Sequence, residues 1–72
     1  MKNYYMINVL KGPGGYSIMA TSEDRLSPSE VLLALEKENC FVERTDVIYA
    51  VVDEIVSEYD IQHFPKRGII SI

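Results

Sequence analysis

The residues best suited to catalysis or metal binding in this 72-residue sequence are its one cysteine, its one histidine and two glutamates, Glu54 and Glu58. Cys40 could act as a nucleophile with His63 as its general base, if folding brings the two side chains together. Glu54 and Glu58 would lie one turn apart on a helix, where a divalent cation could bridge their carboxylates. Neither pair comes with the further groups that such chemistry needs, so an enzyme built on them is the last of three hypotheses. We predict a non-catalytic protein with no metal ion or other cofactor.

A glycine-rich segment, residues 12–15, is the one stretch that could cradle a phosphate. Phosphate-binding loops lead into a helix whose first amides converge on the anion, whereas residues 16–22 read as a strand. Pro13 presets φ for the second position of a turn, and Gly14 accepts the positive φ of the third position in a type II turn. We therefore predict a β-hairpin turn at this point.

The composition restricts the class of protein. The chain has 11 acidic and 7 basic side chains and a formal net charge of −4, which argues against non-specific binding to nucleic acid. A single cysteine excludes a disulfide within the chain and fits a reducing compartment. No apolar run approaches the roughly 20 residues of a membrane helix, and residues 1–10 lack the apolar region of a signal peptide. We predict one soluble, cytoplasmic domain, residues 1–72, with no membrane partner and no small-molecule ligand.

The order of periodic segments predicts a small α+β domain with the element order β-β-α-α-β. An antiparallel hairpin and a C-terminal strand are expected to pack against two helices. The start of the first helix is the sharpest local signal, because Ser27 and Glu30 can form a capping box with proline at the first helical position. The predicted strands are residues 3–10, 16–22 and 69–72, and the predicted helices are residues 28–38 and 46–59.

The second predicted helix carries an unusually wide apolar face. At about 100° per residue, its apolar side chains from Val47 to Tyr59 spread over roughly half of the circumference, and Asp53 and Glu54 lie on the remaining side. Residues 47–52 are also good strand formers, so a buried strand is the alternative for that stretch. We prefer the helix because the apolar positions continue at helical spacing through Tyr59.

This surplus of apolar surface predicts binding to another protein. A domain of this length has a small core, and a face wider than the sheet can cover would be buried against a partner or a second copy of the chain. The competing interpretation is a core helix that is covered within the protomer. Our first hypothesis is a small acidic regulator, adaptor or inhibitor that binds a protein partner, with a homodimer as one form. The predicted partner-binding residues are Tyr4, Met6, Met19, Tyr49, Asp53, Glu54, Val56 and Glu58.

The second hypothesis is a DNA-binding regulator. A strand at 16–22 followed by two helices is similar to the order in ribbon-helix-helix proteins, whose paired strands enter the major groove, and residues 43–59 resemble the second helix of that fold. Several features depart from the pattern. The side chains that would read the bases, Ser17, Met19 and Thr21, carry no charge. The extra hairpin strand would compete for the pairing edge, and the net charge is negative.

Overall fold

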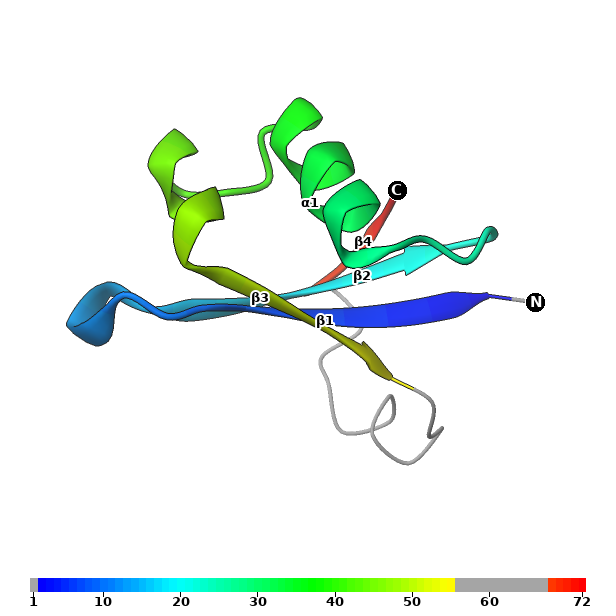
Figure 1. The fold of residues 1–72 in the computed structure, drawn as a ribbon, viewed down its shortest axis with the longest axis horizontal. Coiled ribbons are helices and arrows are strands. Elements are labelled where there is room, and N and C mark those ends of the chain that lie inside the picture. Colours follow the sequence, from blue (N-terminus) through cyan, green and yellow to red (C-terminus); the bar gives the residue numbers. More distant parts are fainter. Residues whose placement is uncertain (1, 56–67) are drawn as a thin grey trace.

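A sheet of four strands with an α-helix over one of its faces organises the described part of the chain (Figure 1). The computed structural model describes residues 2–55 and 68–72. The combination of sheet and helix confirms the predicted α+β class. In chain order the elements are β1 (Asn3–Val9), the 3₁₀ helix η1 (Gly12–Gly14), β2 (Tyr16–Ser22), α1 (Pro28–Lys37), the 3₁₀ helix η2 (Arg44–Tyr49), β3 (Ala50–Ile55) and β4 (Ile69–Ser71).

The predicted hairpin is present, but its turn differs from the predicted one. β1 and β2 pair antiparallel from Asn3 opposite Ser22 to Val9 opposite Tyr16. The chain reverses through η1, and the glycine with positive φ is Gly12, at 68°, so the predicted type II turn with Gly14 in that role is wrong. A loop longer than a tight turn lets the chain close through a 3₁₀ turn instead.

Two further strands extend the hairpin on its two sides, in the order β3-β1-β2-β4. β3 pairs antiparallel with β1, and β4 pairs parallel with β2. The predicted C-terminal strand is therefore confirmed, and its pairing continues past β4 because the Ile72 N–H donates to the Thr21 carbonyl at 2.9 Å. β1 and β2 form the centre of the sheet.

The first helix begins at Pro28, as predicted, and ends at Lys37, one residue before the predicted end. The Ser27 hydroxyl accepts from the Glu30 N–H at 3.3 Å, and the Glu30 carboxylate accepts from the Ser27 N–H at 3.0 Å, which completes the capping box. Pro28 occupies the first turn, and Asn39, with φ of 55°, follows the helix in the left-handed region that ends helices. No helix in the described residues is long and apolar enough to cross a lipid bilayer.

Replacing Ser27 with alanine is expected to lower the free energy of unfolding by about 0.5–2 kcal/mol, because the Glu30 N–H loses its acceptor. Ser29→Ala, at an exposed position inside the same helix, is the matched control and should change stability by less than about 0.5 kcal/mol. Urea denaturation followed by circular dichroism measures both. Equal changes in the free energy of unfolding for Ser27→Ala and Ser29→Ala would contradict the role of Ser27 as the helix cap.

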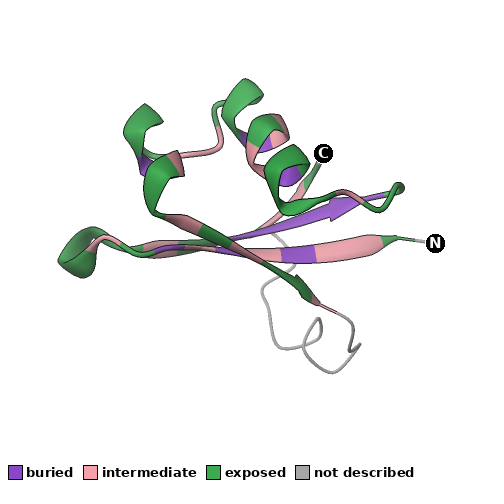
Figure 2. Cartoon of the chain, viewed as in Figure 1, coloured by how far each residue is buried: buried purple, intermediate pink, exposed green. Residues whose placement is uncertain are grey.

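The hydrophobic core lies between the sheet and α1. Alternation along the hairpin strands places Tyr5, Ile7, Ile18 and Ala20 on one face, and α1 adds Val31 and Leu35 from above. Figure 2 shows buried segments on the strands of the sheet and on α1 above it. The cluster consists of Tyr5, Ile7, Ile18, Ala20, Val31 and Leu35.

The predicted second helix over residues 46–59 is wrong. Residues 44–49 form η2, residues 50–55 form β3, and residues 56–59 lie outside the described part of the chain. The alternative for residues 47–52, a buried strand, is correct in type from Ala50 onward, but the strand lies at the edge of the sheet and none of its residues is fully buried. The helical spacing was outweighed by β-branched residues, which favour a pleated strand, and by the edge of β1, which supplies partners for their backbone groups. Where a second helix was expected to lie on the sheet, the described chain instead adds a strand to it.

The replacement of the second helix by β3 also argues against the ribbon-helix-helix architecture. That fold needs a strand that pairs with its copy in a second chain and is followed by two helices. Here β2 is paired on both sides, with β1 and β4, and α1 is followed by η2 and a strand. Met19 and Thr21 therefore lie between two neighbouring strands of the same protomer, and Ser17 is paired with Asn8 of β1.

Candidate functional site

A buried carboxylate, Asp46, joins η2 to the hairpin end of the sheet. Its side chain is 1% exposed and accepts hydrogen bonds from Lys11 Nζ at 2.7 Å and from the Tyr16 hydroxyl. The Glu43 N–H donates to the same carboxylate at 3.1 Å. The Tyr16 hydroxyl also accepts from the Val42 N–H at 2.9 Å. These contacts hold the segment after α1 against the two ends of the hairpin loop.

The groups in this cluster stabilise one another's protonation states. The hydrogen bond from Lys11, and then the one from Tyr16, lowers the pKa of Asp46, and the same bond raises the pKa of Lys11. Burial, followed by the hydrogen bond to Asp46, raises the pKa of the Tyr16 hydroxyl. At neutral pH the cluster is a carboxylate, an ammonium and a neutral phenol. These shifts move all three groups away from the pKa near 7 that suits a general acid or base, which indicates a structural role.

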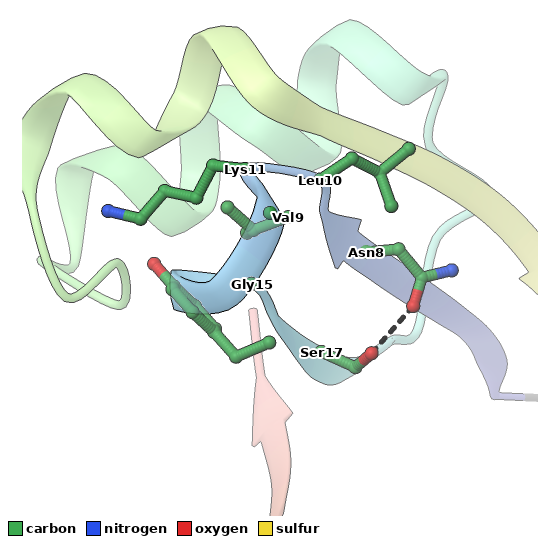
Figure 3. A pocket seen from close by; sticks show the side chains of 8 residues that line it. Asn8, Val9, Leu10, Lys11, Gly15 and Ser17 are labelled. Atoms are coloured by element: carbon green, nitrogen blue, oxygen red, sulfur yellow. Dashed lines mark hydrogen bonds between the residues drawn. The ribbon is translucent and has the colours of Figure 1, made fainter.

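A shallow depression of about 430 Å³ borders the hairpin loop (Figure 3). Asn8 and Ser17 lie side by side on one side of it, joined by a hydrogen bond of 2.6 Å, and Lys11 extends away from them. Lys11 is the one cation among the lining residues, and it contacts Asp46 at 2.7 Å and Glu43 at 3.4 Å. Because two carboxylates already balance its charge, the depression offers an anion no unshared positive group. The glycine-rich segment connects two strands and does not lead into a helix.

Cys40 follows α1 and is half-buried against the core cluster. Burial, and then the charge of Glu38, raises the pKa of its thiol. Reactive cysteines have a lowered pKa, because the thiolate is the nucleophile. His63, the predicted base, lies outside the described residues. The surroundings of Cys40 therefore favour a packing role.

We expect the Cys40 thiol of the native protein to react with iodoacetamide at least about tenfold more slowly than that of the urea-unfolded chain. The physical reason is the raised pKa together with partial burial. Mass spectrometry of timed, quenched samples measures both rates. A native rate equal to or above the unfolded rate would contradict a packing role and revive the nucleophile hypothesis.

Asp53 and Glu54, which were expected on one side of a helix, lie on opposite faces of β3. Glu54 is opposite Tyr5 in the β1–β3 register and lies on the face that carries α1, where its carboxylate contacts Arg25 at 3.2 Å. Asp53 is opposite Met6 and points to the other face. Val56 and Glu58 lie outside the described residues, so the predicted Glu54–Glu58 pair is not placed. Within residues 2–55 and 68–72 there is no group of three or more potential metal-ligating side chains.

Four of the predicted partner-binding residues, Tyr4, Met6, Met19 and Asp53, share the sheet face opposite α1, which we call the outer face. The register sets Met6 between Asp53 of β3 and Met19 of β2, and Tyr4 is two residues from Met6 on the same side. Tyr4 and Met6 are half-buried and Asp53 is exposed, whereas Met19 is buried and offers little surface to a partner. The outer face is therefore accessible toward β3 and closed toward β2.

The most exposed part of the outer face contains residues that the sequence analysis missed. Leu10 and Tyr49 are held side by side by the hydrogen bond from the Leu10 N–H to the Tyr49 carbonyl at 3.0 Å. Val51 lies next along β3, opposite Asn8. Leu10, Tyr49 and Val51 are 64%, 45% and 46% exposed. We call Leu10, Tyr49, Val51 and Asp53 the β3 surface.

Of these four residues, only Tyr49 and Asp53 were predicted. Val51 was missed because it was only one of many residues on the wide apolar face of the predicted helix and was not singled out there. No signal in the sequence identifies Leu10, since its neighbour Tyr49 is distant along the chain. Ile48, which precedes Tyr49, is also largely exposed.

Comparison of the chain with protein-family models, with curated proteins and with solved structures finds no match. The β3 surface is therefore interpreted from its own residues alone.

Proposed function

We propose that this chain is a non-catalytic interaction module that binds a protein partner through the β3 surface. The observation that carries the proposal is the gathering of large exposed apolar side chains at one place in the fold. Val51 lies on β3, and Leu10 and Tyr49, which directly follow β1 and precede β3, are joined by a backbone hydrogen bond at the same end of the pair. Contiguous exposed apolar groups beside a polar rim are typical of protein interfaces.

The chemistry of the surface indicates the kind of partner. Tyrosine is enriched at interfaces because its ring buries a large area while its hydroxyl stays hydrated. Asp53 adds a carboxylate at the edge of the apolar group, and the chain has a formal net charge of −4. A partner with an apolar patch and neighbouring cations fits this surface, and nucleic acid does not. The single cysteine suits a reducing, cytoplasmic setting for this interaction.

Differential affinity capture tests the proposal. The tagged wild-type chain and the Val51→Glu variant are incubated with extract of the native host, and bound proteins are quantified. We expect a partner whose recovery falls about tenfold or more with Val51→Glu, because a charge is placed in the centre of the interface. Leu33→Glu is the matched control and should leave recovery unchanged, since Leu33 is an exposed leucine on α1, which covers the sheet face opposite the outer face.

Circular dichroism must show both variants folded, and light scattering measures self-association of each. A homodimer that dissociates in Val51→Glu would identify a second copy as the partner. Equal recovery of every bound protein by wild type and Val51→Glu, with no change in self-association, would overturn the proposal.

A further inference from the structure

The geometry of β3 provides more than an apolar patch. β3 lies at one end of the order β3-β1-β2-β4, and its inner side pairs with β1 over six residues, Ala50 to Ile55. Among the described residues, no strand pairs with its outer side. Backbone groups of an extended strand alternate between its two sides, so part of the N–H and C=O groups of β3 point away from the sheet.

Edge strands are commonly protected from pairing by being very short, by bulges, by proline or lysine, or by other charged side chains. Of these devices β3 carries only charged side chains, the carboxylates of Asp53 and Glu54. The register between β1 and β3 runs one-to-one without a bulge, and the strand sequence AVVDEI contains neither proline nor lysine. By contrast, the strand at the other end of the sheet, β4, has three residues. The longer and more regular of the two edges is therefore the one beside the β3 surface.

The charges on β3 select among the strands that could pair with it. Glu54 contacts Arg25, whereas Asp53 makes no ion pair with any described residue. Antiparallel pairing with a second copy would bring Asp53 and Glu54 of both chains onto neighbouring strands, and like charges on neighbouring strands destabilise a sheet. A cation facing Asp53 stabilises it. The edge thus favours a cationic segment of another protein over a copy of itself.

We infer that the partner of the β3 surface inserts an extended segment as an added strand along the outer side of β3, with a lysine or arginine facing Asp53 and β-branched residues beside it. Main-chain hydrogen bonds to β3 supply affinity, and the cation sets the register. The outward side chains of that segment then continue the apolar surface of Leu10, Tyr49 and Val51. This inference rests on the proposed function and gives it a binding mode.

A set of three synthetic peptides of about eight residues tests the mode on the full chain. The first has a central lysine flanked by valine and threonine, the second has glutamate in place of lysine, and the third is the lysine peptide with every backbone amide N-methylated. Fluorescence anisotropy measures their affinities. We expect the lysine peptide to bind at least about tenfold more tightly than the other two, because the second repels Asp53 and the third lacks main-chain donors.

Charge reversal gives the decisive comparison. Asp53→Lys should reverse the preference, so that the glutamate peptide binds more tightly than the lysine peptide. Glu36→Lys changes the net charge of the chain equally at an exposed position on α1 and should leave the preference unchanged. Hydrogen exchange should slow at amides within residues 50–55 when the lysine peptide binds.

The inference is overturned by any of three results: no peptide binds, N-methylation has no effect, or Asp53→Lys leaves the preference as it was. A homodimer that dissociates in Val51→Glu would also overturn it, because a second copy would then occupy the edge. If Val51→Glu still loses its captured partner while N-methylation changes nothing, the proposed function stands and strand addition fails. If Val51→Glu loses no partner, both fail.

Discussion

Replacing Leu35 with alanine is expected to lower the free energy of unfolding by about 2–5 kcal/mol, because it removes a fully buried side chain and leaves a cavity. Leu35 is 0% exposed and joins α1 to the core cluster beneath it. A core of this size supplies roughly 3–5 kcal/mol of net stability. The variant should therefore be largely or partly unfolded at room temperature.

Leu33→Ala is the control for that experiment. The same substitution is made two residues away in the same helix, but Leu33 is 66% exposed, so the change should stay within about 0.5 kcal/mol. Urea denaturation followed by circular dichroism gives both values, and the comparison cancels the effect of alanine on helix propensity. Similar losses for Leu33 and Leu35 would mean that α1 does not pack against the sheet by the face described.

The elements predicted correctly from the sequence are those whose signals are local. The capping box at Ser27 needs residues that lie within one turn, and the hairpin strands need only alternation and a loop between them. The segment 46–59 has no such local signal, because its side chains fit a helix and a strand almost equally well. The edge of β1, which is more than 40 residues away along the chain, decides between them by supplying backbone partners.

The candidate site was predicted in part, and for the wrong reason. Tyr49 and Asp53 were assigned to the surplus face and the polar side of a helix, but both are exposed because they lie on an edge strand or just before it. Leu10 and Val51 join them only through the pairing of β1 with β3, which sequence spacing does not encode. Pairing between strands, and not the width of a helix, creates the exposed apolar surface.

Replacing Asp46 with asparagine is expected to cause a large fall in the melting temperature. The fall should exceed that of any other single change to a polar side chain described above. Asparagine keeps the size of the side chain but places a neutral amide beside the Lys11 ammonium, so a buried ion pair is lost. Differential scanning calorimetry at neutral pH measures the shift. Glu43→Gln, which alters the exposed carboxylate at 3.4 Å from the same lysine, is the control and should leave the melting temperature close to that of the wild type.

The pH dependence separates the loss of charge from a simple packing defect. The pKa of Asp46 is lower in the folded protein than its ordinary value of 3.8, so the folded state binds fewer protons there than the unfolded state in acid. The contribution of Asp46 to the free energy of unfolding is fully present above pH 3.8 and is lost as the pH falls through the lower pKa of the folded state.

The alkaline limit comes from Lys11 and Tyr16, whose pKa values in the folded protein are raised above 10.5 and 10.0. Their contributions to the free energy of unfolding are fully present below those values and are lost as the pH rises through the pKa values of the folded state. The difference in melting temperature between wild type and Asp46→Asn should therefore be widest between these limits and narrow on both sides. A difference that stays constant from acid to alkaline pH would show that asparagine disturbs packing alone and that the ion pair adds nothing to stability.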